Sequence, residues 1–318
     1  MIKKFLSLFL IIIGTSIHTN FVAMQSQPKI DESIAITLIS TNILDEELYQ
    51  TLSRPAKSGM AWEKREKIFL NALADEKQLA TANILCMQEF NSNTQANAIK
   101  YLQSMNYQGY AKPNITAPSI WFKTNVFNAI DQNYFPFKTV GAQANGFAIT
   151  FLTPKNKITP IIGVINAHLN NNTPATTTYD QFRLDQIQEI LAHVNNPERK
   201  NYNWVICGDF NTDRRTHAQI MQPFITKGFV DSHSHQMATA KSSQEKNPLK
   251  SIDYVWFKGP NLQLVTTDVY PPVNTFEQML LAHRPSDIQG TFFTDHAILK
   301  TEFKLNLSQP ELPKKAQD

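Results

Sequence analysis

The stretch Trp204-Val205-Ile206-Cys207-Gly208-Asp209-Phe210-Asn211 decides the fold of this chain. Its first four residues form an apolar run, which predicts a strand over residues 205–208 that is buried on both faces. The strand ends in a glycine that is followed by an acidic residue and, two positions later, an amide. Polar side chains at strand ends can converge on one rim of a layered fold, where binding sites are usually built. One acidic residue after a strand is common, so this stretch alone does not assign a function.

Other apolar strands in the chain also end in polar residues. These strand ends carry residue types that suit a metal ion or a phosphate group: Asn42, Glu89, His168, Asp253, and Asp295 with His296. Each has an ordinary explanation when taken alone, since asparagine is frequent in turns and buried carboxylates and histidines are usually hydrogen-bonded. Their recurrence at the ends of separate strands argues against chance and favours one shared site.

Strands outnumber helices in the pattern along the chain. Apolar runs predict strands at residues 34–39, 83–87, 119–122, 146–152, 161–165, 205–208, 251–257 and 297–303. Helical spacing predicts helices at residues 61–79, 95–105, 179–194 and 218–226. Because most of the strands are unbroken apolar runs, we expect both faces of each sheet to be covered. The pattern therefore predicts a two-sheet sandwich flanked by helices, within the α/β class.

The first residues are typical of an export leader. Met1-Ile2-Lys3-Lys4 is a short basic segment, and a nearly unbroken apolar run over 5–13 follows it. Ala23 is a suitable cleavage position, although Phe21 fits the small-residue rule poorly. We expect a signal peptide over 1–23, with an uncleaved anchor or a misassigned core segment as alternatives. No later apolar stretch reaches membrane length, so the mature chain is expected to be periplasmic or secreted.

One domain is expected over residues 30–306, followed by a flexible tail over 307–318. A hydrophobic share of 42% and a charged share of 18% are ordinary for a folded protein and argue against disorder. The formal net charge of +3 suits a polyanionic substrate but does not single out nucleic acid, because no run of lysine or arginine forms a patch. Cys86 and Cys207 lie in apolar runs and are expected to be buried free thiols, although export permits a disulfide.

Glu89 and Asn42 suit a divalent cation. A phosphodiester is anionic and resists attack, so a hard divalent ion is needed to neutralise it, and hard ions take oxygen ligands. Glu89 would supply a carboxylate and Asn42 a neutral amide oxygen. Asp295 would either approach a second metal position or only shape its loop. The expected cofactor is Mg2+, with Mn2+ as an alternative.

The remaining strand-end residues suit the other requirements of hydrolysis. Asp209 would position and deprotonate the attacking water. Asn211, His168 and His296 would donate hydrogen bonds to the phosphoryl oxygens as negative charge grows there. A histidine does this best when a carboxylate holds its ring, and Asp253 is the candidate to hold His296.

Several motifs resemble those of the endonuclease/exonuclease/phosphatase superfamily. In order along the chain they are Ile84-Leu85-Cys86-Met87-Gln88-Glu89, His168-Leu169 with Arg183 and Gln186 on the next helix, Gly208-Asp209-Phe210-Asn211, Ser251-Ile252-Asp253-Tyr254-Val255 and Thr294-Asp295-His296. The match runs from about Ile36 to Phe303, and Thr294 stands where many members carry serine. The resemblance implies a metal-dependent phosphoesterase with a four-layer αββα sandwich, in which helices flank two mixed sheets.

Shorter matches are similar to the deadenylase and nocturnin-like branch of that superfamily. They are Asn42-Ile43-Leu44, then Trp62-Glu63-x-Arg65 before the first helix, and Asn106-Tyr107-Gln108-Gly109 after the second. This resemblance implies a Mg2+-dependent 3′ exonuclease acting on RNA, or a phosphatase acting on a nucleotide cofactor. Trp62 also fits a buried core aromatic. The wider superfamily includes DNases, lipid phosphatases and sphingomyelinases, which share the centre and differ in their rim loops.

Two loops are expected to form the rim of the site. Loop 170–178 is rich in asparagine and threonine, and loop 271–294 carries aromatic residues and Arg284. The aromatic side chains would stack a base, contact a lipid chain or cover the edge of the sandwich. Arg183 and Arg284 would bind the substrate phosphate, unless they are solvated or salt-bridged.

Three functions are compatible with these observations. The first is an exported Mg2+-dependent phosphoesterase acting on nucleic acid or nucleotides, which we favour over lipid headgroups. The second is a phosphoinositide phosphatase or a sphingomyelinase-type lipid phosphodiesterase. The third is a non-catalytic module that keeps the fold; it predicts the loss of a central group, and the chain retains them all. Endo- or exo-action and the number of metals stay open, and no obligate protein partner is expected.

Overall fold

The computed structural model describes residues 32–43, 62–75, 79–93, 95–112, 117–138, 146–170, 177–215, 217–233, 239–241, 249–270 and 296–307. The chain divides into two compact units, Met1–Asp31 and Glu32–Asp318, and every described residue belongs to the second. Several predicted features lie outside the described residues: the leader over 1–23, Arg284, Asp295, most of both rim loops and the tail beyond Leu307.

Within the described residues, two six-stranded sheets form the centre of the second unit. The first sheet has the order β13-β14-β1-β2-β4-β3, with β13 Leu262–Tyr270, β14 Ile298–Asn306, β1 Ser33–Asn42, β2 Ile84–Phe90, β4 Ala117–Lys123 and β3 Tyr107–Tyr110. The second has the order β5-β6-β7-β8-β12-β9, with β5 Phe127–Pro136, β6 Gly146–Pro154, β7 Ile162–His168, β8 Asn203–Asp209, β12 Asp253–Lys258 and β9 Val230–Asp231. Each sheet contains one parallel pair, β1 with β2 and β7 with β8, so both sheets are mixed as predicted.

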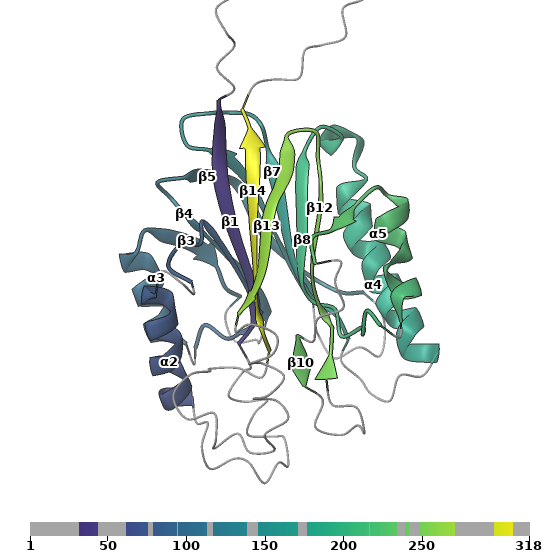
Figure 1. Cartoon of the computed structure of the whole chain (residues 1–318), viewed down its shortest axis with the longest axis horizontal. Coiled ribbons are helices and arrows are strands. Elements are labelled where there is room, and N and C mark those ends of the chain that lie inside the picture. Colours follow the sequence, from purple (N-terminus) through teal and green to yellow (C-terminus); the bar gives the residue numbers. More distant parts are fainter. Residues whose placement is uncertain are drawn as a thin grey trace, which may run out of the picture. The chain divides into compact units, whose positions relative to one another are not determined.

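Helices cover the outer face of each sheet (Figure 1). α2 (Trp62–Ala74) and α3 (Ala96–Ser104) pack on the first sheet through Phe69, Leu73 and Leu102. α4 (Thr177–Val194) and α5 (Gln222–Thr226) pack on the second through Ile187 and Phe224. Short 3-10 helices lie at Pro197–Arg199 and Ala218–Met221, and a small ribbon pairs β10 (Ala240–Lys241) with β11 (Leu249–Lys250). The four-layer αββα sandwich is therefore confirmed.

The central strands are apolar runs because both of their faces are buried. In β2, Ile84 and Cys86 point between the sheets, whereas Leu85 and Met87 pack under the helices. β8 does the same, with Val205 facing the other sheet. Alternating residues thus serve two different cores, and no position on these strands needs to be polar until the strand ends.

The predicted strands missed β3, β5, β9 and β13, which are the edge strands of the two sheets. Exposed and partly buried residues dominate their burial patterns; β13, for example, has a single buried residue, Leu262. An edge strand packs on fewer neighbours, so its sequence is not an apolar run and resembles a loop.

Two predicted helices were wrong in extent or type. The helix expected over 61–79 ends at Ala74, after which the Leu79 N–H donates to the Ala72 carbonyl. Leu79 packs in the same core as the helix although it lies beyond the helix end, which explains why its spacing was misleading. The helix expected over 218–226 is a 3-10 turn followed by the five-residue α5, and Pro223 lies in the first turn of α5.

Cys86 and Cys207 are buried free thiols in the core between the sheets, which confirms the prediction. Burial raises the pKa of the Cys86 thiol well above its usual value, and the hydrogen bond with Cys207 adds to this rise. Among the described helices, none has the length and apolarity required to cross a membrane.

His233 predicts a pH-dependent stability. Its side chain is 1% exposed, and burial lowers its pKa to about 4, while the carbonyl of Asp268 favours the protonated ring and the charge of Arg214 disfavours it. In the unfolded chain the pKa of a histidine is about 6.5, so between about pH 6.5 and pH 4 only the unfolded chain binds this proton. Acidification across this window should therefore lower the free energy of unfolding, by about 3 kcal/mol at its lower end.

Urea unfolding at pH 7 and pH 4.5 measures this effect. His233→Gln removes the titrating group, so the variant should lose less stability on acidification than the parent chain. Equal losses in the two proteins would contradict the assignment.

Candidate active site

The strand register places polar residues from both sheets at one end of the sandwich. In the second sheet His168 pairs with Asp209 across β7 and β8, and Asp209 pairs with Asp253 across β8 and β12. The first sheet contributes Asn42 at the end of β1, Glu89 in β2, and His296 just before β14. The structure thus brings together strand-end residues that are separated by up to 254 positions between Asn42 and His296.

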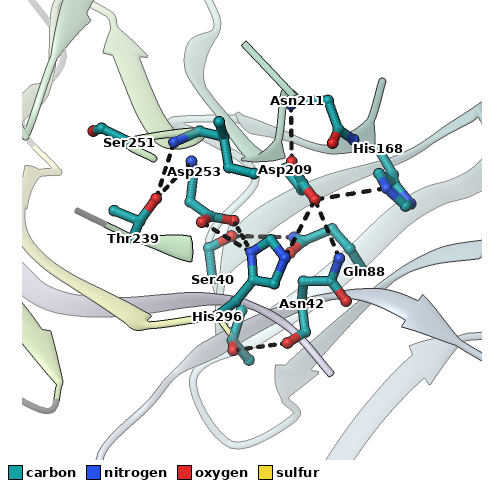
Figure 2. A network of polar contacts seen from close by, with 12 residues as sticks. Ser40, Asn42, Gln88, His168, Asp209, Asn211, Thr239, Ser251, Asp253 and His296 are labelled. Carbon is teal, nitrogen blue, oxygen red and sulfur yellow. Dashed lines mark hydrogen bonds and ion pairs between the residues drawn. The ribbon is translucent and has the colours of Figure 1, made fainter. Parts of the chain in front are cut away.

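Asp209 lies at the centre of this group (Figure 2). Its Oδ2 is 3.2 Å from Asn42 Nδ2, 3.6 Å from His168 Nε2 and 3.7 Å from His296 Nε2. Its Oδ1 accepts a hydrogen bond of 2.8 Å from the backbone N–H of Asn211. The side chain is almost completely buried, so its carboxylate is held in one orientation by groups from both sheets.

The backbone around Asp209 can be formed only with a glycine before it. Gly208 has φ +137°, and a Cβ at this position would lie 1.9 Å from the carbonyl oxygen of Ala167. Asn211 has φ +49°, and its Nδ2 donates 2.9 Å to the Leu169 carbonyl. A left-handed conformation costs a non-glycine residue about 1–2 kcal/mol, so these contacts must hold Asn211 in place. Asn211 is predicted to donate a hydrogen bond to the phosphate, and one of its two side-chain amide hydrogens is thus already used to fix the turn.

Glu89 and Asp209 form an oxygen-rich position that fits a divalent cation. Asn42 Nδ2 is 2.9 Å from Glu89 Oε1 and 3.2 Å from Asp209 Oδ2, so two carboxylate oxygens converge on one point. His168 Nε2 is 3.9 Å from the same Glu89 oxygen. Glu89 has φ +56°, a left-handed backbone conformation. Carboxylate oxygens are the ligands that a hard cation takes.

Asn42 presents its nitrogen, not its oxygen, to the two carboxylates. In this orientation the Asn42 amide donates hydrogen bonds to two carboxylates, and a positive ion between those carboxylates would also be favourable. To ligate a cation through Oδ1, the amide must turn by about 180° about its last side-chain bond, which interchanges the two ends of a nearly symmetrical group. The predicted role of Asn42 as an oxygen ligand therefore requires this turn.

Asp253 and His296 form a hydrogen-bonded pair. His296 Nδ1 lies 3.1 Å from Asp253 Oδ1 and 3.0 Å from Oδ2, and the Nε2 on the other side of the ring faces Asp209. Burial raises the pKa of Asp253, whereas the charge and hydrogen bond of His296 lower it. A carboxylate on Nδ1 holds the ring and favours a proton on that nitrogen. Asp209, Asp253 and His296 also each have one potential ligand atom within 4.8 Å of the others.

Arg183 is buried in α4 beside the site. Its Nε donates 3.0 Å to the Asn170 carbonyl, and its Nη1 lies 3.1 Å from Asp180 Oδ1. Burial lowers the pKa of Arg183, whereas Asp180 and, more weakly, Asp209 raise it. These contacts give Arg183 a role in holding the segment that follows His168, and its predicted contact with substrate phosphate stays a prediction. Arg284 and Asp295 lie outside the described residues.

Other polar residues of the site were not predicted. Gln88 Nε2 donates a hydrogen bond of 2.6 Å to Asn166 Oδ1. This bond connects the first sheet to the second at the residue before Glu89. Asn166 Nδ2 in turn donates to the carbonyls of Met87 and Ser119. A polar residue inside an apolar run is the signal that would have identified both amides. Thr239 also contacts the site, and no pattern in the sequence marks it.

Comparison with known proteins gives a family and a branch. A family model described as "Endonuclease/Exonuclease/phosphatase family" matches residues 54–296. The "CCR4-Not complex 3'-5'-exoribonuclease subunit Ccr4" of Candida albicans (strain SC5314 / ATCC MYA-2876) is 22% identical over 77% of this chain. This chain spans 38% of the length of that curated relative.

Two solved structures have the same fold. ANGEL2, described as a 2′,3′-cyclic phosphatase and solved in complex with adenosine-2′,3′-vanadate, gives a TM-score of 0.69 at 18% identity over 86% of this chain and 97% of its own. The human Nocturnin catalytic domain with bound sulfate gives a TM-score of 0.61 at 18% identity over 86% of this chain and 96% of its own. These matches confirm the predicted sandwich and agree with the resemblance to the deadenylase and nocturnin-like branch.

Proposed function

Because the chain belongs to the endonuclease/exonuclease/phosphatase family, whose members hydrolyse phosphoester bonds, we propose that it is a Mg2+-dependent phosphoesterase. Its substrates would be phosphodiesters or phosphomonoesters in nucleic acid or nucleotides, and it would act after export. The observation that carries the proposal is the position of Asp209, whose Oδ2 faces Asn42, His168 and His296.

Each residue of the site has a distinct part in the proposed reaction. Asp209 orients the attacking water and takes its proton, because its carboxylate is fixed at the centre of the group. His168 and His296 face the same point and donate to the phosphoryl oxygens, and Asp253 holds the ring of His296. Asn211 supports the phosphate with the amide hydrogen that does not bind the Leu169 carbonyl.

Glu89 and Asn42 would hold the cation at the oxygen-rich position next to Asp209. When bound, Mg2+ supplies positive charge that offsets the negative charge of the phosphate and of the transition state. Mn2+ takes similar oxygen ligands and is the alternative. Asp295 is proposed to approach a second metal position or to shape its loop, and Arg183 and Arg284 to bind the substrate phosphate.

The relatives support nucleic acid or nucleotides over lipid. Ccr4 is named as a 3'-5'-exoribonuclease, and ANGEL2 as a 2′,3′-cyclic phosphatase that was solved with an adenosine compound. A formal net charge of +3 is compatible with an anionic polymer. The signal peptide expected over 1–23, with its basic start and apolar run, supports export.

A substrate panel tests the proposal on the full chain. It contains a single-stranded RNA oligomer, the same oligomer ending in a 2′,3′-cyclic phosphate, a DNA oligomer, a dinucleotide cofactor with a 2′-phosphate, and vesicles of phosphoinositide or sphingomyelin. We expect hydrolysis of at least one nucleic-acid or nucleotide member with Mg2+, and loss of that activity with excess EDTA.

Hydrolysis of the lipids alone would replace the proposal by the lipid-phosphodiesterase alternative. Binding without hydrolysis, unaffected by EDTA, would favour the non-catalytic module. Export is tested on the same protein recovered from the periplasm of an expressing bacterium, where mass spectrometry should find Met24 as its first residue; retention of Met1 would contradict cleavage after Ala23.

A further inference from the structure

Thr239 binds the backbone of Asp253 and of Ala297, the residue that follows His296. Its side-chain oxygen accepts hydrogen bonds of 3.0 Å from the backbone N–H groups of Ile252 and Asp253. The Thr239 carbonyl accepts a hydrogen bond of 2.7 Å from the N–H of Ala297, the residue after His296. Figure 2 shows Thr239 beside Asp253, on the side away from His296.

The Thr239 hydroxyl oxygen uses both of its lone pairs. It can accept two hydrogen bonds, and here it accepts them from two backbone N–H groups. The residue is 1% exposed, so water cannot easily replace these partners. Thr239 is itself fixed, because its backbone N–H donates 2.7 Å to the Lys250 carbonyl beside the β10–β11 ribbon.

The pair needs such a connection because its members belong to different sheets. Asp253 begins β12 in the second sheet, whereas His296 leads into β14 in the first. Strand pairing sets distances within a sheet and leaves the separation of two facing sheets to side chains. Thr239 binds the Asp253 strand through its hydroxyl and the His296 segment through its carbonyl, so one residue links the two.

We propose that Thr239 is a positioning residue for the hydrolytic reaction: it fixes the backbone at Asp253 and the segment that carries His296, so that the two side chains meet and His296 Nε2 faces Asp209. This inference rests on the proposed function, because it assigns a part in that reaction. The hydroxyl, not the bulk of the side chain, carries the role, since all of the contacts to Ile252 and Asp253 are made by Oγ1.

Thr239→Val and Thr239→Ser separate the hydroxyl from the shape. Valine keeps the volume and removes the hydroxyl, and we expect kcat to fall by about 10- to 100-fold with KM changed less than about threefold. Serine keeps the hydroxyl and should restore kcat to within about threefold of the parent. The assay uses bis(4-nitrophenyl) phosphate with Mg2+; cleavage of this phosphodiester releases 4-nitrophenolate, so the natural substrate need not be known.

Thr301→Val is the matched control. Thr301 lies in β14 and is also fully buried, but its Oγ1 has no hydrogen-bond partner within the described part of the chain. Replacing it with valine removes the same atom at a comparable depth, and kcat should stay within about twofold, because no contact of the site is lost.

A double-mutant cycle shows whether Thr239 acts through the pair. In a His296→Ala background, Thr239→Val should lower kcat no further, because the ring that it positions is gone. An undiminished further loss would mean that Thr239 acts independently of His296, and would overturn the proposal. So would a folded Thr239→Val protein with kcat within twofold of the parent, or equal losses in the serine and valine variants.

Folding and the proposed function are checked separately. Circular dichroism melts identify variants that do not fold. If Thr239→Val does not fold, Thr239→Ala, which leaves room for water, replaces it. Failure of both to fold would overturn the proposal in favour of a purely structural role.

Nitrogen-15 NMR of the histidine rings gives a readout without turnover. The hydrogen-bonded Nδ1 proton of His296, assigned by its absence in His296→Gln, should be present in the parent and the serine variant and lost in the valine variant. If the parent hydrolyses nothing, the proposed function fails while this signal still decides the positioning.

Discussion

Asp209→Asn is expected to lower kcat by about 10^3- to 10^4-fold at saturating Mg2+, with little change in the melting temperature. Asparagine keeps the size of the side chain and the acceptor for the Asn211 N–H, so the turn after β8 should be preserved. It removes the negative charge and the proton acceptor that three donors surround. The amide cannot take a proton from water. It also carries no negative charge to attract the two histidines that face it.

The measurement is kcat on the most active member of the substrate panel, with circular dichroism to establish folding. Asp213→Asn is the matched control, because Asp213 lies four positions later in the same segment and its carboxylate binds Arg215. We expect this control to keep kcat within about threefold even if its stability falls. Activity of a folded Asp209→Asn protein near that of the parent would remove Asp209 from the proposed role.

Glu89→Gln is expected to act on the cation instead. Glutamine keeps an oxygen at the same place but loses the charge, so the Mg2+ concentration for half-maximal activity should rise by at least about tenfold, and kcat should fall on the order of 10^3-fold. Part of the loss should be recovered at high Mg2+, because a weakened site can still be filled by mass action. In Asp209→Asn, kcat should stay low even at high Mg2+, because the proton acceptor itself has been removed.

Activity titrated against Mg2+, together with calorimetric titration of Mn2+ binding, distinguishes these results. Glu189→Gln is the control, since Glu189 is a carboxylate of α4 that binds the Lys138 N–H on the outside of the sandwich. An unchanged Mg2+ requirement in Glu89→Gln would mean that Glu89 does not hold the cation. An unchanged requirement combined with low kcat would move Glu89 to a role in orienting the water or the phosphate.

The interior of the fold was predictable from single segments, and its edges were not. β2, β6, β7 and β8 are continuous apolar runs because helices cover one face and the other sheet covers the second. β5 and β13 lie at the edges, where many side chains meet solvent, and their sequences resemble loops. Local hydrophobicity reports burial, and an edge strand is defined by its hydrogen bonds to one neighbour, which the sequence does not display.

The candidate site divides in the same manner. Polar residues at the ends of apolar strands could be predicted as site residues; they are Glu89, His168, Asp209 and Asp253. Their order along the chain matched the motifs of the superfamily. Thr239 could not be found, because it belongs to no predicted element and acts through hydrogen bonds to residues 252, 253 and 297. The amide link between Gln88 and Asn166 joins two strands of different sheets that are 78 positions apart.

The sequence by itself determined which residues are candidates for the chemistry, because burial forces a strand to be apolar until it reaches the rim, and the first polar residues there stand out. The stretch Gly208-Asp209-Phe210-Asn211 is the clearest case. Only the tertiary structure decided that Asp209 lies within 3.7 Å of both His168 and His296, and that the amide nitrogen of Asn42 faces two carboxylates. The physical reason is that these groups come from two facing sheets. The relative placement of the sheets depends on the packing of their cores and on a few buried hydrogen bonds between them, and no single segment of the sequence encodes that packing or those bonds.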